Sequence, residues 1–172
     1  MRTAVGHPGN VVSAQTKEYK VKAAYLYNFT RYVSGMDSSN GAGGGAFVIG
    51  VLGENPFGNA LTKIAASKTA QGKPIRIQEF ASFADYNSCD ILFVSGQVSD
   101  EVMSAIVRQT DRQPVLVVAE SPGFCELGRT INFQQRPDGR LGIEINIDAV
   151  GRRQLVVDAK LMKLATIVRD AE

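Results

Sequence analysis

Apolar residues between positions 18 and 33 recur with the period of an α-helix, and they predict one helix over this stretch. The stretch holds four of the five tyrosines in the chain, which is more aromatic surface than one buried stripe requires. At about 100° of turn per residue, its apolar side chains fall on one broad arc, which we expect to face a core. That arc comprises Val21, Tyr25, Leu26, Phe29, Tyr32 and Val33.

The opposite side of this helix carries Lys20, Tyr27 and Arg31, because steps of seven and eleven residues return a helix to nearly the same direction. We therefore predict an exposed tyrosine between two cations, an arrangement suited to a protein interface. Lys22 lies inside the apolar arc, one turn after Glu18, at the spacing at which a glutamate and a lysine pair on a helix. We interpret Lys22 as a side chain whose ammonium group reaches water past the edge of the core.

The middle of the chain alternates between predicted strands and helices. Continuous apolar runs at 46–52, 89–95 and 114–119 are typical of strands that are covered on both faces. The run at 73–80 alternates instead, which predicts a half-buried strand near a sheet edge. A predicted helix from about 100 to 109 joins the second and third apolar runs, so those two strands should be parallel.

Two connections before these elements have clear local signals. Asn55 is the expected N-cap of a second helix that begins at Pro56 and runs to about Ala66, since proline favours the first helical position. Residues 34–45 are rich in glycine and serine, and they predict a flexible loop.

The last third of the chain predicts a β-hairpin followed by a helix. Residues 130–134 should pair with 141–147 through a turn at 137–139, whose Pro-Asp-Gly sequence favours a tight turn. A short helical piece should run from Asp148 to about Gln154. Asp158 should cap a final helix with an apolar stripe of Leu161, Leu164, Ala165 and Val168.

These elements predict an α/β fold with a mixed, mainly parallel central sheet flanked by helices, a C-terminal β-hairpin and a terminal helix. A length of 172 residues with 44% hydrophobic content fits one domain, which we place at residues 16–172. Residues 1–15 are predicted to be a disordered leader or the remnant of a signal peptide, because 12–14 have the small residues of a cleavage site without the apolar segment that precedes one. An ordinary polar leader fits these residues equally well.

Charge and residue content exclude several classes of function. Nineteen basic and 17 acidic residues are interleaved and give a net charge of +2, so no basic stripe predicts nucleic-acid binding. No apolar run reaches the length that spans a membrane. The only histidine, His7, lies in the leader, which argues against a Ser-His-Asp triad, a Cys-His pair or a histidine-built metal site. We therefore predict no catalytic residues, no metal and no cofactor.

The two cysteines are predicted to be free thiols. Cys89 enters its strand at the N-terminal end, whereas Cys125 follows the C-terminal end of the neighbouring parallel strand. Strands rise about 3.3 Å per residue, so the two cysteines should lie about 15–20 Å apart. A disulfide requires Cα atoms within about 7 Å of each other.

A candidate ligand site lies at the C-terminal ends of the parallel strands, where open α/β sheets hold ligands. The residues expected to line that crevice are Glu54, Asn55, Ser95, Gln97, Glu120 and Ser121. The same residues also fit ordinary loop and capping roles. Phe124, beside glycines, fits either a loop anchor buried in the core or a contact with a partner.

Several segments, in order and at fitting distances, resemble the YfiR family of periplasmic regulatory proteins. The matching segments are 19–29 with 31–33, 48–53 with 55–58, 89–95, 121–124, 131–133, 145–146 and 161–165. Each segment alone is a weak signal, but together they cover nearly everything after residue 18.

The resemblance implies an exported α/β domain without catalysis that acts on an inner-membrane signalling protein. In the best-known arrangement of the family, that partner is a diguanylate cyclase, which the YfiR-like protein holds inactive, and an outer-membrane lipoprotein relieves the inhibition. Related domains also occur at the sensing end of signalling proteins, and members of the family can form homodimers. The expected partner is therefore an inner-membrane signalling protein, either a diguanylate cyclase or a histidine kinase.

The chain departs from the family pattern at three places. Ser34-Gly35 stands where the family has a Trp-Pro pair, Gly128-Arg129 replaces paired glycines, and Val157-Asp158 replaces serines. These differences concern the choice of partner more than the fold, and disulfide-linked redox sensing is not carried over.

We therefore predict a non-catalytic periplasmic signalling regulator in cyclic-di-GMP signalling. The residues expected to contact its partner are Lys20, Tyr27, Arg31 and Phe124. The alternative is a sensor domain that binds a small molecule in the crevice at the C-terminal ends of the strands.

Overall fold

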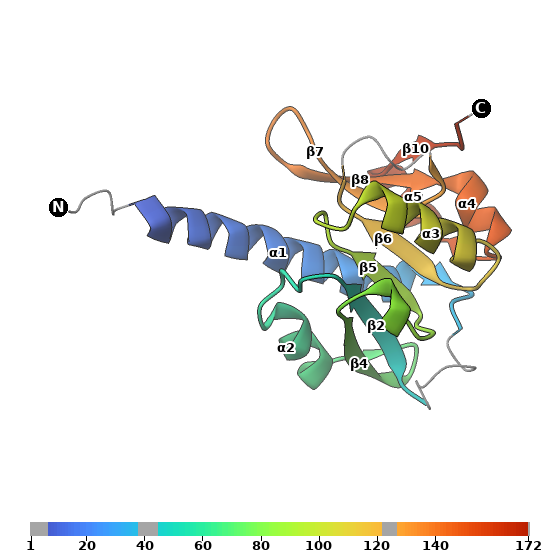
Figure 1. Cartoon of the computed structure of the whole chain (residues 1–172), viewed down its shortest axis with the longest axis horizontal. Helices are drawn as coiled ribbons and strands as arrows, with labels where there is room; N and C mark the ends of the chain where they lie inside the picture. Colours follow the sequence, from blue (N-terminus) through green and yellow to red (C-terminus); the bar gives the residue numbers. More distant parts are fainter. Residues whose placement is uncertain (1–6, 38–44, 122–126, 172) are drawn as a thin grey trace.

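The computed structural model describes residues 7–37, 45–121 and 127–171, and in these residues the strands form one eight-stranded and one two-stranded sheet (Figure 1). The strands are β1 (Val33–Ser34), β2 (Phe47–Leu52), β3 (Thr69–Ala70), β4 (Lys73–Phe80), β5 (Ile91–Val94), β6 (Leu116–Ala119), β7 (Ile131–Gln135), β8 (Leu141–Asn146), β9 (Val156–Val157) and β10 (Thr166–Val168). The helices are α1 (His7–Tyr32), α2 (Ala60–Ser67), the short 3₁₀ turn η1 (Phe83–Asp85), α3 (Asp100–Thr110), α4 (Ile147–Arg152) and α5 (Ala159–Leu164).

The large sheet has the strand order β10-β8-β7-β6-β5-β2-β4-β3. Five neighbouring strands of this sheet are mutually parallel, namely β4, β2, β5, β6 and β7. Strand β8 runs antiparallel to β7, and β10 is parallel to β8. Strands β1 and β9 form the small antiparallel sheet at the end of α1. The predicted class, a mixed and mainly parallel sheet flanked by helices, is confirmed.

Alternating side chains of the central strands build two hydrophobic cores, one on each face of the sheet. On one face, Ile49, Phe93 and Val118 pack with residues of α1, α2, α4 and α5. On the other face, Leu92 and Val117 pack against α3. This arrangement explains why the central strands read as continuous apolar runs: both of their faces are buried.

Helix α1 lies along the first of these faces, and Figure 1 shows that its N-terminal part extends beyond the sheet. It begins at His7, eleven residues before the predicted start at position 18, and ends at Tyr32. Leu26 and Phe29 are fully buried as expected. Val21 was expected in the buried arc, but its side chain is 42% exposed, so that part of the prediction is wrong. The arc that packs on the sheet is narrower than the apolar arc of the sequence.

Several predicted elements match closely. Strand β4 has the predicted bounds, β5 and β6 are parallel and joined by α3, and β7 and β8 form the predicted hairpin. Asp158 caps α5 by accepting a hydrogen bond from the backbone N–H of Lys160 at 2.8 Å.

Two further helix boundaries were wrong. Helix α2 begins at Ala60, with Asn59 rather than Asn55 at the N-cap. Helix α5 ends at Leu164, and Thr166–Val168, expected to continue it, forms strand β10 beside β8. The β-branched residues of this segment favour a strand, and pairing with β8 decides the outcome.

Candidate functional site

A cleft of about 600 Å³ opens at the carboxyl ends of β2, β5 and β6, between α1 and the loop that leads to α2. Such a volume is within the usual range of small-molecule sites, roughly 300–1,000 Å³. Its principal lining residues are Thr16, Tyr19 and Lys20 of α1, Glu54, Phe57 and Asn59 of the β2–α2 loop, and Ser95, Gln97 and Glu120 at the strand ends.

The topology of the sheet explains the position of the cleft. After β2, the chain passes through α2 toward β4, whereas after β5 it passes through α3 toward β6, in the opposite direction along the sheet. Leu61 of α2 belongs to one core, and Ile106 of α3 belongs to the other. The connections that follow β2 and β5 therefore separate to opposite faces, and neighbouring strands that do so leave a crevice between them.

The structure brings four of the six predicted crevice residues into this cleft: Glu54, Ser95, Gln97 and Glu120. Asn55 and Ser121 are not among its lining residues. The Asn55 side chain instead accepts a hydrogen bond from the backbone N–H of Phe57 at 2.8 Å and donates one to Glu79 at 3.3 Å. Asn55 therefore shapes the loop beside the cleft.

Glu120 connects α1 to the strand ends. Its Oε1 accepts hydrogen bonds from the Tyr19 hydroxyl at 2.9 Å and from Lys22 Nζ at 2.7 Å. Its Oε2 accepts from the backbone N–H of Gly96 at 2.8 Å and from the same hydroxyl at 3.1 Å. The carboxylate is thus fully engaged, and it positions the groups around it.

Gly96 permits this close contact between the loop after β5 and the end of β6. A Cβ atom at this position would lie 3.2 Å from Glu120 Oε2 and 3.3 Å from its Cγ. Any other residue would have to displace the carboxylate, and the backbone hydrogen bond would lengthen.

Lys22 is the cation of this cluster, and its side chain is only 6% exposed. The predicted pair with Glu18 is confirmed, with Nζ 2.6 Å from the carboxylate. The expectation that the ammonium group reaches water is wrong, because it also lies 2.7 Å from Glu120 and 4.5 Å from the centre of the Tyr19 ring. Two carboxylates and an aromatic face replace the water that a buried ammonium group would lose.

Tyr19 forms part of the cleft wall. Its ring meets the Phe57 ring edge-on, with centroids 5.5 Å apart, and Phe57 in turn contacts Phe93 of β5 at 4.8 Å. Burial first, and then the neighbouring Glu120 carboxylate, raise the pKa of the Tyr19 hydroxyl well above its ordinary value. The hydroxyl therefore stays protonated and serves as a hydrogen-bond donor to Glu120.

Sequence reasoning missed Tyr19 and Lys22 as site residues. Lys22 is 98 residues from Glu120 in the chain, and the local sequence around either residue does not predict a contact with the other. The available signals were a lysine inside an apolar arc and a glutamate directly after a buried strand. Both signals indicate charge close to a core, and such charge needs a partner.

The outer face of α1 differs from the expected patch in one respect. Lys20 and Arg31 are exposed as predicted, but Tyr27 is half-buried and packs against the core cluster. The Lys68 ammonium group lies 5.7 Å from the centre of the Tyr27 ring. The expectation of a fully exposed Tyr27 is wrong, because α2 and the segment after it approach this side of the helix. Phe124 lies outside the described residues.

Cys89 is a buried free thiol, and burial raises its pKa to about 12. A thiol that stays protonated at neutral pH is a poor nucleophile. Cys125 lies outside the described residues, so the predicted absence of a disulfide between the two stays a prediction.

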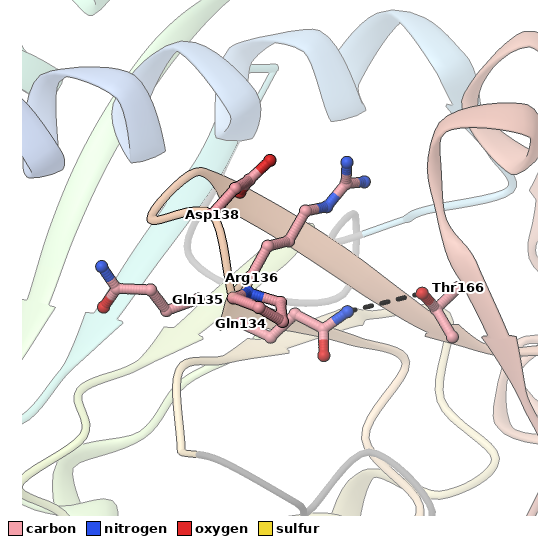
Figure 2. A pocket seen from close by; sticks show the side chains of 6 residues that line it. Gln134, Gln135, Arg136, Asp138 and Thr166 are labelled. Carbon is pink, nitrogen blue, oxygen red and sulfur yellow. Dashed lines mark hydrogen bonds between the residues drawn. The ribbon is translucent and has the colours of Figure 1, made fainter.

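A second, shallow pocket of about 430 Å³ lies at the tip of the β7–β8 hairpin (Figure 2). Gln134 donates a hydrogen bond from its side chain to the Thr166 hydroxyl at 3.4 Å, and Arg136 donates to the backbone carbonyl of Leu164 at 3.3 Å. These bonds fasten the hairpin to α5 and β10. The other lining residues, Gln135, Pro137 and Asp138, are exposed, so we assign this pocket a structural role.

Within the described part of the chain, no group of three or more histidine, cysteine, aspartate or glutamate residues is arranged to hold a metal ion. No helix in the same residues is both long and apolar enough to cross a bilayer.

Comparison with known families gives a match that covers most of the chain. Residues 19–166 match the model of a family described as YfiR/HmsC-like. No curated protein matches the sequence. The matched region begins at Tyr19, in the cleft wall, and ends at Thr166, the first residue of β10.

Proposed function

The chain belongs to the YfiR/HmsC-like family, and we propose that it is a non-catalytic periplasmic regulator that binds and restrains a membrane signalling protein such as a diguanylate cyclase. The observation that carries the proposal is the family match, which spans the C-terminal half of α1, nearly all of the sheet and most of the cleft. Membership of this family suggests a regulatory domain in cyclic-di-GMP signalling rather than an enzyme.

The hydrogen bonding of Glu120 supports a role without catalysis for this carboxylate. A general acid or base needs an oxygen or nitrogen that is free to exchange a proton with a substrate. Both oxygens of Glu120 instead accept hydrogen bonds from Tyr19, Lys22 and Gly96. The best-buried carboxylate beside the cleft therefore holds α1 in place.

The partner surface in this proposal is the outer side of α1, with Lys20, Arg31 and the half-buried Tyr27, together with Phe124. The proposal includes three further partners: a histidine kinase in place of the cyclase, an outer-membrane lipoprotein that relieves the restraint, and a second copy of the chain.

Deletion of the gene tests the proposal directly. Loss of a restraining protein should raise cellular cyclic-di-GMP, and the full-length gene supplied on a plasmid should restore the original level. A pull-down from membranes should first identify the cyclase that the protein binds. In a strain that lacks this cyclase, deletion of the gene should leave the cyclic-di-GMP level unchanged. An unchanged cyclic-di-GMP level in the single deletion would refute the proposed function.

The cleft favours a second candidate function, a sensor that binds a small molecule. The specific observation is the position of the cleft at the carboxyl ends of β2 and β5, from which the connecting segments run in opposite directions along the sheet. A ligand at about a hundred times its dissociation constant stabilises a protein by roughly 2.7 kcal/mol, which a thermal shift detects. Such a shift should shrink in Gln97→Ala, in the cleft, and persist in Gln109→Ala, on α3. A shift that persists in both variants would place the ligand elsewhere.

A further inference from the structure

One face of α1 stays uncovered along the whole described length of its side chains. The positions on it follow helical spacing, so they form one stripe about 21 Å long at 1.5 Å per residue. This outer stripe comprises Lys17, Lys20, Val21, Ala24, Asn28 and Arg31. All of these residues are exposed except Asn28, which is half-buried.

The outer stripe carries positive charge at both ends. Lys17 and Lys20 lie toward its N-terminal end, and Arg31 lies toward its C-terminal end. Within the described residues, none of these three cations has a carboxylate within 4 Å. The one acidic residue nearby on the helix, Glu18, faces Lys22 on the inner side. The stripe therefore carries three charges of one sign without compensation.

The centre of the outer stripe is small and apolar. Among the α1 side chains that the structure describes, Val21 is the most exposed large hydrophobic residue, and Ala24 lies one turn beyond it. A small residue at the centre of a helix face allows another helix to approach closely, at an interaxial distance of about 8–10 Å. A central apolar contact flanked by charged groups is the usual layout of a protein interface.

The same stripe is poorly suited to a lipid surface. Helices that lie in a membrane interface insert large apolar side chains such as tryptophan, phenylalanine or leucine. Of the α1 side chains that the structure describes, the large apolar Leu26 and Phe29 are instead buried completely against the sheet. On the described outer stripe, Val21 and Ala24 are the only apolar side chains that could contact hydrocarbon, so these observations favour a protein partner.

We propose that the outer stripe of α1 binds an acidic helix of a protein partner, whose carboxylates meet Lys17 and Lys20 at one end and Arg31 at the other, and whose small apolar side chains lie on Val21 and Ala24. The identity of the partner as a membrane signalling protein rests on the proposed function, whereas the acidic character of the docking helix rests on the charges of the stripe.

A small photo-crosslinking amino acid that replaces Ala24 tests this proposal. The full chain that carries it is expressed in the organism that encodes the protein. The matched control position is Ala159, an exposed alanine on α5. The expected product is a crosslink from position 24 to a peptide of net negative charge in another protein, with a yield well above that from position 159.

Charge reversal then tests the electrostatic part. Lys17→Glu with Lys20→Glu should lower the crosslink yield at least about tenfold, because like charges across an interface strongly disfavour association. Lys160→Glu with Lys163→Glu makes the same change in net charge on α5 and should leave the yield unchanged. Circular dichroism of both variants verifies that the helices are intact.

Each other outcome overturns the inference. Crosslinks from position 24 to lipid, to a second copy of the chain or to a segment without net negative charge would contradict it. So would a yield no higher than at position 159, or equal losses in the two charge-reversed variants.

If deletion of the gene raises cyclic-di-GMP while position 24 shows any of these results, the inference fails and the proposed function stands. If deletion has no effect while position 24 crosslinks to an acidic segment, the proposed function fails and the inference stands.

Discussion

Two charge clusters differ in how closely the buried cation of each lies to a carboxylate. The Glu120 cluster comprises Glu18, Tyr19, Lys22, Gly96 and Glu120, beside the cleft. The Arg153 cluster comprises Thr110, Asp111, Gly128, Arg152, Arg153 and Asp170, where α3 and α4 meet the end of the chain. In the first cluster the buried cation lies 2.7 Å from a buried carboxylate, whereas in the second the fully buried Arg153 has its closest described carboxylate, that of Asp111, at 3.9 Å.

The other partners of Arg153 in the described part of the chain are neutral oxygens. Its guanidinium donates to the Thr110 hydroxyl at 3.0 Å and to the backbone carbonyl of Gly128 at 3.3 Å. Burial lowers the pKa of Arg153 to about 10, and the nearby Asp111 opposes that change only in part. The comparison indicates that the Glu120 cluster is a matched ion pair that fixes α1 beside the cleft, whereas the Arg153 cluster buries a cation at a cost that its neutral partners only partly offset.

The largest effect expected from this difference is at Glu120. Glu120→Ala leaves Lys22 buried with one remaining carboxylate, that of Glu18, and removing one member of a buried pair typically costs about 3–5 kcal/mol. We expect a loss of unfolding free energy near the lower end of that range, because Glu18 stays in place. Urea denaturation, with the slope of the transition verified, measures it.

Two further variants sharpen the result at Glu120. Glu18→Ala removes a carboxylate whose side chain is 48% exposed, and it should cost less than about 1 kcal/mol. Lys22→Met combined with Glu120→Gln removes both buried charges and should recover most of the loss. A single Glu120→Ala variant as stable as the wild type would show that the pair contributes nothing to holding α1.

A smaller effect is expected at Arg153. Arg153→Met removes two hydrogen bonds from a charged group, worth about 1.5–3 kcal/mol each, and it also removes a desolvated charge, which offsets much of that loss. The matched variant, Lys22→Met, leaves the Glu120 carboxylate buried without its closest cation and should cost more. Equal losses of unfolding free energy in the two variants would contradict the view that Lys22 is matched by a carboxylate and Arg153 is not.

The hydrophobic pattern was sufficient to predict those strands whose burial follows a simple rule, either alternating or continuous. Strand β4 has the predicted bounds because Ile75 and Ile77 alternate with polar residues. The central strands are continuous apolar runs because both faces of the sheet are covered. Strand β10 was missed because Leu161, Leu164 and Val168 also fit a helical period, and only pairing with β8 separates the two readings.

The candidate site was predictable in position but not in its contacts. The rule that ligands bind beyond the carboxyl ends of parallel strands located Glu54, Ser95 and Gln97 correctly around one cleft. The pairing of Lys22 with Glu120 depends on how α1 lies across the strand ends, which is a property of tertiary packing. Local periodicity describes which face of a helix is apolar, and it does not describe which loop the helix covers.

The smallest effect is expected at the exposed edge of the Arg153 cluster, and it depends on pH. Partial burial raises the pKa of Asp170, but hydrogen bonds from Arg152 and Asn146 outweigh that effect, so its pKa lies below the ordinary 3.8. The unfolded chain therefore binds a proton first as the pH falls, and the stability that Asp170 contributes is present above about pH 4 and is lost below it. Because both partners are partly exposed, Asp170→Asn should cost no more than about 1 kcal/mol at neutral pH.

Urea unfolding of wild type and Asp170→Asn between about pH 7 and about pH 3 measures this contribution, and the difference should shrink toward zero at the acid end. The matched control is Asp138→Asn, since Asp138 lies 3.9 Å from the highly exposed Arg140 at the hairpin tip and should contribute nothing measurable at any pH. A difference at Asp170 that stays constant down to about pH 3 would show that the asparagine changes packing rather than an ion pair. In that case the contrast between the clusters would rest on their buried members, Lys22 with Glu120 and Arg153, because only these would be distinguished by how their charges are matched.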